Sequence, residues 1–128
     1  MQSRLILIVE DNDDAREALR MLLELDGHVV EAAAEGTQAL EIARGKDPDV
    51  ALVDIGLPGI DGYEVARRIR AFGTRRPLLI ALTGYGQPED RRRATEAGFD
   101  SMLVKPVDPA SLSELLAPLE IPARGSRE

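Results

Sequence analysis

The 128-residue sequence contains no cysteine, no tryptophan and a single histidine, His28. The absence of cysteine excludes disulfide bonds, thiolate nucleophiles and cysteine-ligated zinc sites. A single histidine also excludes metal sites that need two or more histidine ligands. His28 could in principle serve in a Ser-His-Asp triad, but it follows an Asp26–Gly27 turn and precedes two valines. We therefore interpret His28 as the start of a strand.

Aromatic residues and positive charge are also scarce. Aromatic side chains make up 3% of the sequence, and the formal net charge is −7 with a sequence pI near 4.8. A negative net charge repels nucleic-acid phosphates, and two Phe and two Tyr are too few to form a base-stacking platform. We expect no direct nucleic-acid partner.

Long apolar runs are missing as well. The longest, Leu5–Val9 and Leu78–Leu82, are far shorter than the roughly 20 residues of a membrane-spanning helix. The N-terminal run stops at Glu10 without a cleavage-like site, unlike a signal peptide. These absences predict no membrane insertion and a cytoplasmic location.

The residues that are present indicate one folded domain. Hydrophobic residues make up 44% of the chain and charged residues 30%, close to the globular averages of about 45–50% and 25%. The length lies within the range of about 100–200 residues that one domain occupies. Residues 120–128 are largely polar and contain Pro, Gly, Ser and Arg. We predict a domain over residues 1–119 and a polar C-terminal tail over residues 120–128.

Short apolar runs alternate with amphipathic stretches along the chain. Leu5–Val9 is a continuous run of leucine and β-branched residues, typical of a strand buried on both faces of a parallel sheet. Similar runs predict four more strands, over Val29–Ala32, Val50–Asp54, Leu78–Leu82 and Ser101–Val104.

The amphipathic stretches predict five helices. In the first, apolar residues recur at helical spacing from Ala15 to Leu23, with Asp14 as the expected N-cap, Glu17 completing a capping box and Gly27 beyond the end. The others are predicted over Gly36–Arg44 (ended by Gly45), Gly62–Ala71, Glu89–Ala97 (closed by Gly98) and from Asp108–Pro109 to Pro118.

Five strands that are each followed by a helix predict an α/β fold. Right-handed crossovers make the sheet parallel, with helices on both faces, as in the doubly wound, flavodoxin-like (βα)5 arrangement with strand order 2-1-3-4-5. Five units are too few for an eight-stranded barrel. The first strand–helix turn lacks the glycines of a dinucleotide site, and no Walker-type loop occurs in the sequence.

Carboxylate side chains follow two of the predicted strands. The first strand ends in Glu10 and Asp11, and the third ends in Asp54. These strands are neighbours in the predicted order, and ligand sites in such sheets lie beyond the carboxyl ends of the strands. Like charges held this close together need a cation, and Mg²⁺ suits a few carboxylates with water and phosphate oxygens. The sequence therefore predicts a Mg²⁺ site at this edge of the sheet.

The same pocket is suited to phosphoryl chemistry. A carboxylate can act as a nucleophile and form an acyl phosphate, provided that cations balance the charge of the transferring group. Lys105, after the fifth strand, supplies such a cation, and Thr83 ends the fourth strand. We interpret Asp13 and Asp14 as helix-capping residues outside the site, and Arg91–Arg93 as a solvated helix face.

Four sequence elements, taken together, resemble the receiver domain of two-component response regulators, and the resemblance covers Leu5 to about Ala117. In chain order the elements are Val9–Asn12, Asp54–Gly62, Ala81–Gly84 and Lys105–Pro106. As a set in this order and spacing they are highly specific, whereas any one alone is not.

The resemblance implies how the carboxylates are used. Asp54 resembles the phosphoacceptor of the family, Asp11 the direct metal ligand, and Glu10 a ligand that acts through water. The backbone carbonyl of Gly56 would complete the protein's share of the Mg²⁺ coordination sphere.

The resemblance also implies roles around the phosphoryl group. Thr83 resembles the hydroxyl that turns toward it, Gly84 leaves access to it, and Lys105 resembles the lysine of the family. The chain departs from the family at Met102, where receivers commonly carry Tyr or Phe as a two-position switch; a flexible thioether has no such behaviour. We predict a cis Lys105–Pro106 bond, because the chain must turn sharply for the lysine to point at Asp54.

The function expected from the resemblance is a Mg²⁺-dependent phosphoacceptor that takes a phosphoryl group from a sensor histidine kinase onto Asp54 and relays or reports it. The segments Ala97–Asp100 and Leu103–Asp108 are most similar to receivers of hybrid sensor histidine kinases, so a downstream histidine phosphotransfer protein is a further possible partner. The domain would catalyse only its own phosphorylation and dephosphorylation. Two alternatives are an aspartyl-nucleophile phosphatase-like hydrolase and a non-phosphorylated interaction module of the same fold.

Overall fold

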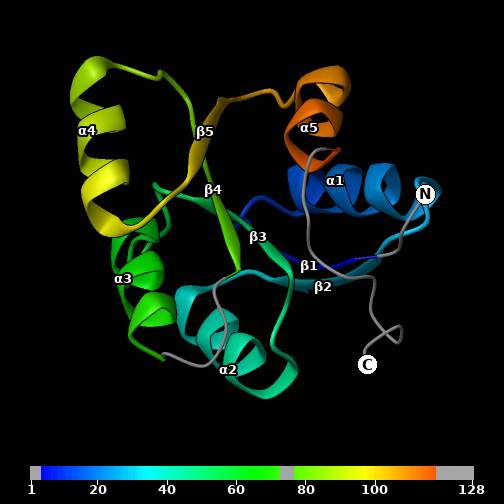
Figure 1. The fold of residues 1–128 in the computed structure, drawn as a ribbon, viewed down its shortest axis with the longest axis horizontal. Coiled ribbons are helices and arrows are strands. Elements are labelled where there is room, and N and C mark those ends of the chain that lie inside the picture. Colours follow the sequence, from blue (N-terminus) through cyan, green and yellow to red (C-terminus); the bar gives the residue numbers. More distant parts are fainter. Residues whose placement is uncertain (1–3, 73–76, 118–128) are drawn as a thin grey trace.

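The structure of the chain is a computed structural model that describes residues 4–72 and 77–117. Five strands alternate with five helices within these residues (Figure 1). In chain order they are β1 (Leu5–Val9), α1 (Asp13–Leu25), β2 (Val29–Ala33), α2 (Gly36–Lys46), β3 (Val50–Asp54), α3 (Gly62–Phe72), β4 (Leu78–Thr83), α4 (Pro88–Ala97), β5 (Ser101–Val104) and α5 (Pro109–Leu116). The predicted helix end at Pro118 and the predicted tail over residues 120–128 lie outside the described residues.

All five strands pair in parallel, in the order β2-β1-β3-β4-β5. The predicted doubly wound fold and strand order are therefore confirmed. The central strands β1 and β3 are buried along their whole length, as the apolar runs Leu5–Val9 and Val50–Val53 require. The register pairs Val9 with Val53 and Asp54 with Leu82, so the ends of β1, β3 and β4 lie side by side at one edge.

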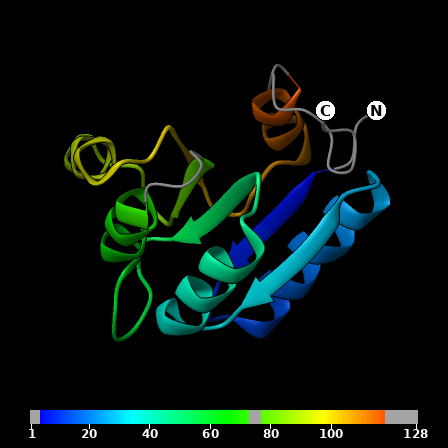
Figure 2. The same ribbon diagram turned by 60° about the horizontal axis from the view of Figure 1, so that its bottom comes forward.

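Helices cover both faces of this sheet, which Figure 2 shows with its strand arrows side by side. Alternate strand residues point to opposite faces and build two separate cores. One core joins the sheet to α2, α3 and α4 through side chains such as Ala39, Val65 and Ala94. The other joins it to α1 and α5 through Leu19 and Leu112. The sheet, including the carboxyl ends of its strands, thus lies between two helical layers.

Two predicted helix boundaries are wrong. The N-cap of α1 is Asn12 and not Asp14, because the Asn12 side-chain oxygen already accepts the Ala15 backbone N–H at 2.8 Å. Asp14 lies in the first turn, where its charge favours the helix dipole. Gly45 lies inside α2, which ends at Lys46 because Asp47 takes the left-handed conformation (φ 53°) that we had expected of the glycine.

Other predicted features are confirmed. Gly98 caps α4 with a φ of 111°, and the Asp108 carboxylate caps α5 by accepting the Ser111 backbone N–H at 3.0 Å. The Lys105–Pro106 bond is cis. Four other element bounds differ from the predicted ones by one residue: β2 ends at Ala33, α3 at Phe72 and β4 at Thr83, and α4 begins at Pro88.

His28 directly precedes β2, and its Nδ1 accepts the backbone N–H of Arg4 at 3.2 Å. This hydrogen bond joins the beginnings of β1 and β2, at the opposite edge from the carboxylates, which agrees with a structural interpretation of the histidine. Among the helices of residues 4–72 and 77–117, none combines the length and the apolar character needed to cross a bilayer.

Candidate functional site

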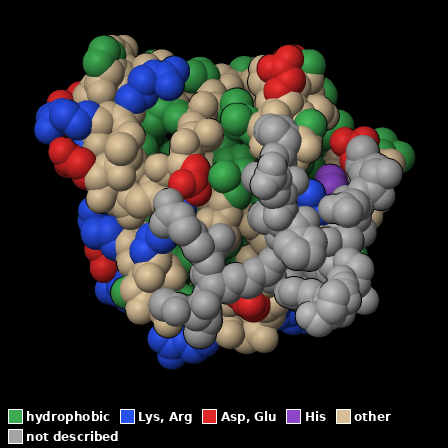
Figure 3. All heavy atoms as spheres, viewed as in Figure 1, with side chains coloured by type: hydrophobic (Ala, Val, Ile, Leu, Met, Phe, Trp, Pro, Cys, Tyr) green, Lys and Arg blue, Asp and Glu red, His purple; other side chains and the backbone are tan. Residues whose placement is uncertain are grey.

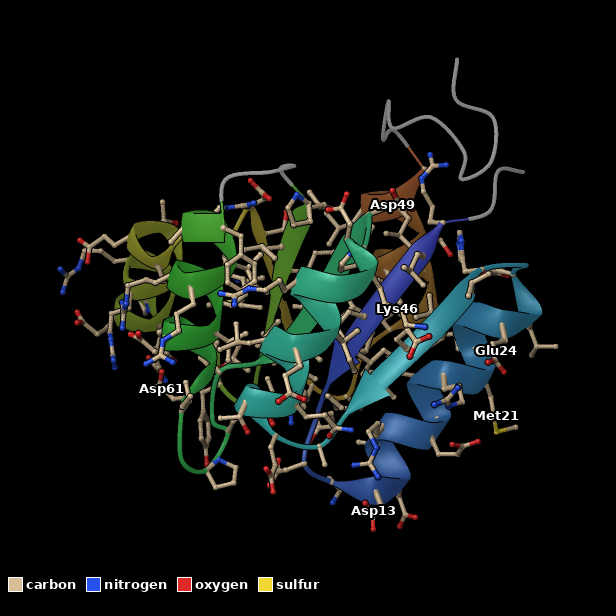
Figure 4. All side chains as sticks on the ribbon, turned by 90° about the horizontal axis from the view of Figure 1, so that it is seen from below. Asp13, Met21, Glu24, Lys46, Asp49 and Asp61 are labelled. Carbon is tan, nitrogen blue, oxygen red and sulfur yellow. The ribbon has the colours of Figure 1, made fainter. Side chains whose placement is uncertain are left out.

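Three carboxylates meet at the carboxyl-terminal edge of the sheet. Glu10 and Asp11 follow β1, and Asp54 ends β3. One carboxylate oxygen from each lies within 4.8 Å of the others. In Figure 4 this edge is marked by Asp13 at the start of α1 and Asp61 just before α3, whereas Asp49 marks the opposite edge. The structure therefore brings together the three side chains that the sequence predicts as metal ligands.

The three carboxylates differ in burial. Glu10 is 1% exposed and Asp54 is 7% exposed, whereas Asp11 faces solvent. Burial raises the pKa of the Glu10 carboxyl above its ordinary value, and hydrogen bonds from Lys105 and from the Asn12 backbone oppose that rise. The pocket is therefore open at Asp11 and closed around the other two residues.

Lys105 supplies a cation to the two buried carboxylates. Its Nζ donates to Glu10 Oε1 and to Asp54 Oδ2, at 2.9 Å in each case. Burial by itself lowers the pKa of Lys105, but the hydrogen bonds to Asp54 and Glu10 and the negative charges of these two carboxylates together outweigh it and raise the pKa above its usual value. The ammonium stays charged and ties the ends of β1, β3 and β5 together.

The second oxygen of Asp54 is held by the backbone. Oδ1 accepts the Gly56 N–H at 2.8 Å, so the loop after β3 fixes the orientation of the carboxylate. A Cβ at Gly62 would lie 2.5 Å from the Ile55 Cα, and only glycine lets α3 begin this close to the end of β3. The expected role of the Gly56 carbonyl as a metal ligand stays a prediction.

Thr83 reaches the same edge at the end of β4. It is 4% exposed, and its Oγ1 accepts the Tyr85 backbone N–H at 3.3 Å. The Thr83 carbonyl also accepts the Lys105 backbone N–H at 2.7 Å, which fixes the spacing between these two residues. The predicted set of Glu10, Asp11, Asp54, Thr83 and Lys105 is therefore delivered by four neighbouring strands to one edge.

Two residues near the carboxylates were missed by sequence reasoning. The Asn12 backbone N–H donates to Glu10 Oε2 at 3.0 Å, and Arg16 Nη1 donates to the Glu10 carbonyl at 2.9 Å. A sequence signal exists for Arg16, because a long cationic side chain one turn into a helix can fold back over the acidic turn before it.

An apolar groove of about 330 Å³ adjoins the carboxylates. It lies between α1 and the segment that joins β5 to α5. Its apolar lining residues are Ala15, Ala18, Leu19, Leu22, Leu82, Pro106, Val107 and Pro109, and Glu10 and Lys105 also line it. On the face that Figure 3 shows, hydrophobic side chains are visible between α4 and α5, and basic side chains lie mainly over α4 and α3. The groove itself places apolar surface beside Glu10 and Lys105.

The parallel 2-1-3-4-5 sheet, with acidic residues after β1 and β3 and a lysine after β5, defines a receiver-type α/β signalling domain. The chain belongs to the response regulator receiver domain family, which matches residues 6–117. It is a receiver domain of two-component systems, whose role is that of a phosphoacceptor.

Two curated relatives are similar over most of this chain. An uncharacterized 14.6 kDa protein of Leptolyngbya boryana is 38% identical over 112 residues, which cover 87% of this chain and 86% of that protein. Response regulator MprA of Mycobacterium ulcerans is 39% identical over 112 residues, covering 88% of this chain and 47% of MprA. The chain therefore spans about half of the length of that regulator.

A solved structure is also similar. The receiver domain of sensor histidine kinase PA1611 from Pseudomonas aeruginosa is 36% identical and superposes with a TM-score of 0.81, covering 88% of this chain and 93% of that one. That structure has a magnesium ion coordinated in its active site cleft.

Proposed function

We propose that the domain accepts a phosphoryl group from a phosphohistidine of a sensor histidine kinase onto Asp54, with Mg²⁺, and relays or reports it. The observation that carries the proposal is the meeting of Glu10, Asp11 and Asp54 within 4.8 Å, with Lys105 bonded to two of them. A histidine phosphotransfer protein is the acceptor if the domain relays the group onward.

The donor set suits Mg²⁺. Carboxylate oxygens are hard ligands, and one exposed and two buried carboxylates leave part of the coordination sphere to water and phosphoryl oxygens. Asp11 and Asp54 would bind directly, Glu10 through water, and the Gly56 carbonyl would add a neutral oxygen. Magnesium in the cleft of the PA1611 receiver supports the same choice of ion.

Different side chains have different roles in the proposed phosphoryl transfer. A carboxylate oxygen of Asp54 forms a bond to phosphorus as the phosphorus–nitrogen bond of the phosphohistidine breaks, and the released imidazole nitrogen takes a proton from solvent. Bound Mg²⁺ supplies positive charge that offsets the carboxylates and the phosphoryl oxygens. Lys105, already beside Asp54, donates to a phosphoryl oxygen, and the Thr83 hydroxyl donates to another.

Incubation with Mg²⁺ and acetyl phosphate, followed by intact-mass measurement, tests the proposal. We expect the mass of one phosphoryl group on the wild-type domain and none on Asp54→Asn, which keeps the shape of the side chain and the fold. Continuous release of phosphate without a stable adduct would favour the hydrolase alternative. No adduct and no turnover would favour an interaction module.

The groove beside Lys105 favours a protein as the natural phosphodonor. A helix of the kinase can place an apolar side chain between α1 and the segment after β5 while its phosphohistidine faces Asp54. Ala18 lines this groove and is remote from the phosphoryl chemistry proposed above. Ala18→Arg is therefore expected to block transfer from a kinase while labelling by acetyl phosphate continues. Equal loss of both reactions would place the groove inside the chemical site.

A further inference from the structure

Arg16 is a positively charged residue near the site, and the phosphoryl transfer proposed above gives it no role. It lies in the first turns of α1, with its side chain 23% exposed, and folds back toward the end of β1. Nη1 donates to the Glu10 carbonyl at 2.9 Å, and Nη2 pairs with the Asp13 carboxylate. A single planar guanidinium therefore bridges both ends of the turn between β1 and α1.

This turn carries two of the three acidic side chains, and three hydrogen bonds hold Glu10 there besides the one from Lys105. The Glu10 N–H donates to the Ala33 carbonyl at 3.0 Å, its Oε2 accepts the Asn12 N–H at 3.0 Å, and its carbonyl accepts from Arg16. Asp11 lies between these anchors and is exposed. Its position therefore depends on the backbone on either side more than on packing.

We propose that Arg16 is a positioning residue for divalent-cation binding. By holding the Glu10 carbonyl and Asp13, it fixes the turn that presents Glu10 and Asp11 to the ion. The inference rests on the proposed function, because it takes the acidic pocket as the Mg²⁺ site. Residues that orient metal ligands from outside the coordination sphere commonly change affinity by about 10–100-fold when they are removed.

The direction of the change in Mg²⁺ affinity on removal of Arg16 distinguishes a positioning role from a purely electrostatic one. Arg16 is a cation close to three carboxylates, so Coulomb's law alone predicts that its removal strengthens Mg²⁺ binding. Positioning predicts the opposite, because a loosened turn must be ordered again when the ion binds. The two interpretations therefore give changes of opposite direction in the same measurement.

The experiment is calorimetric titration of Mg²⁺ into the wild-type domain, Arg16→Met and Arg16→Lys. We expect binding about tenfold weaker in Arg16→Met, and part of that loss recovered in Arg16→Lys, whose ammonium can still donate to the carbonyl. The ¹H–¹⁵N signal of Asn12 should move or broaden in Arg16→Met without Mg²⁺, because its hydrogen bond to Glu10 shares the same turn. Unchanged or tighter Mg²⁺ binding in Arg16→Met overturns the proposal.

Arg20→Met is the matched control. Arg20 lies one turn further along α1 and pairs with Glu17 and Glu24, so its substitution removes an equal charge without touching the β1–α1 turn. We expect wild-type or slightly tighter Mg²⁺ binding in this variant. Wild-type protein that binds no Mg²⁺ would overturn the proposed function, whereas normal binding in both wild type and Arg16→Met would overturn the role of Arg16 alone.

Discussion

The positive charge of Lys105 offsets part of the negative charge of the acidic pocket. Its ammonium lies 2.9 Å from an oxygen of Glu10 and 2.9 Å from an oxygen of Asp54. The same two carboxylates would also attract an added cation. The ammonium is free to turn to a phosphoryl oxygen without leaving the neighbourhood of Asp54. On the proposed function, one residue would therefore serve as a counterion before the reaction and as an electrostatic catalyst during it.

Lys105→Ala should separate metal binding from phosphoryl transfer. We expect Mg²⁺ to bind at least as tightly, because a competing cation is gone, while labelling by acetyl phosphate slows about a hundredfold. Calorimetry and intact-mass time courses measure the two effects. Lys46→Ala, which removes a charge paired with Glu31 on the far side of β1, should change neither. A wild-type labelling rate in Lys105→Ala would contradict the assigned role.

His28 makes folding stability depend on pH. Burial lowers its pKa below the ordinary 6.5, the Asp26 carboxylate opposes this shift, and Arg4 adds to it. The unfolded chain therefore binds a proton at His28 more readily than the folded chain does. The contribution of neutral His28 to the free energy of unfolding is fully present above about pH 6.5 and is lost as the pH falls below it. Protonation also removes the Nδ1 acceptor for the Arg4 N–H.

Urea unfolding of wild type and His28→Asn between about pH 8 and pH 5 measures this dependence. Asparagine places an uncharged acceptor near the position of Nδ1, so the variant should match the wild type at high pH and lose less stability on acidification. Parallel pH profiles for the two proteins would mean that other groups account for the loss.

At the scale of helices and strands, hydrophobic periodicity was sufficient to predict the sheet. The runs that became β1, β3 and β5 have the predicted bounds because each is a short apolar segment between turn residues. Helix ends were harder to predict, since Asn12 and Asp14 are both good caps and only the local geometry selects Asn12. Contacts such as Arg16 to the Glu10 carbonyl depend on side-chain direction, which spacing alone does not give.

β5 carries Met102 at the position where the resemblance to receivers leads us to expect Tyr or Phe. Met102 pairs with Ala81 of β4 in the sheet and packs partly buried against the core that includes α3 and α4. Tyr85, the aromatic residue after Thr83, is 83% exposed. Methionine has several rotamers of similar energy, so a bound phosphoryl group would not favour one side-chain conformation strongly over another. The structural change in β4 and β5 on phosphorylation should therefore be small.

Amide shifts with and without a phosphate mimic, in wild type and Met102→Tyr, test this expectation. We predict modest changes over residues 78–104 in the wild type and larger ones in the tyrosine variant, because a ring can occupy two distinct positions. Large wild-type shifts that the substitution does not increase would show that Met102 leaves the response intact.

At the scale of the whole molecule, we expect the acidic pocket to make the stability of the fold depend on divalent cations. Three clustered carboxylates repel one another, and an ion that binds only the native state adds stability by mass action. We predict a higher melting midpoint with Mg²⁺, equivalent to about 2.7 kcal/mol at a hundred times Kd. Asp11→Ala should abolish the shift, and an unchanged wild-type midpoint at millimolar Mg²⁺ would count against the pocket.

The hydrogen bond from Lys105 to Glu10 joins residues 95 positions apart and sets an order in which the site can be completed. The acidic side chains come from β1 and β3, within the first 54 residues, whereas Thr83 and Lys105 arrive with the last two strands. Closing so long a loop is entropically unfavourable until the intervening strands have paired. A nascent or partly folded chain can therefore collect its acidic residues early, but on the proposed function it would reach the full rate of phosphoryl transfer only when β5 has docked.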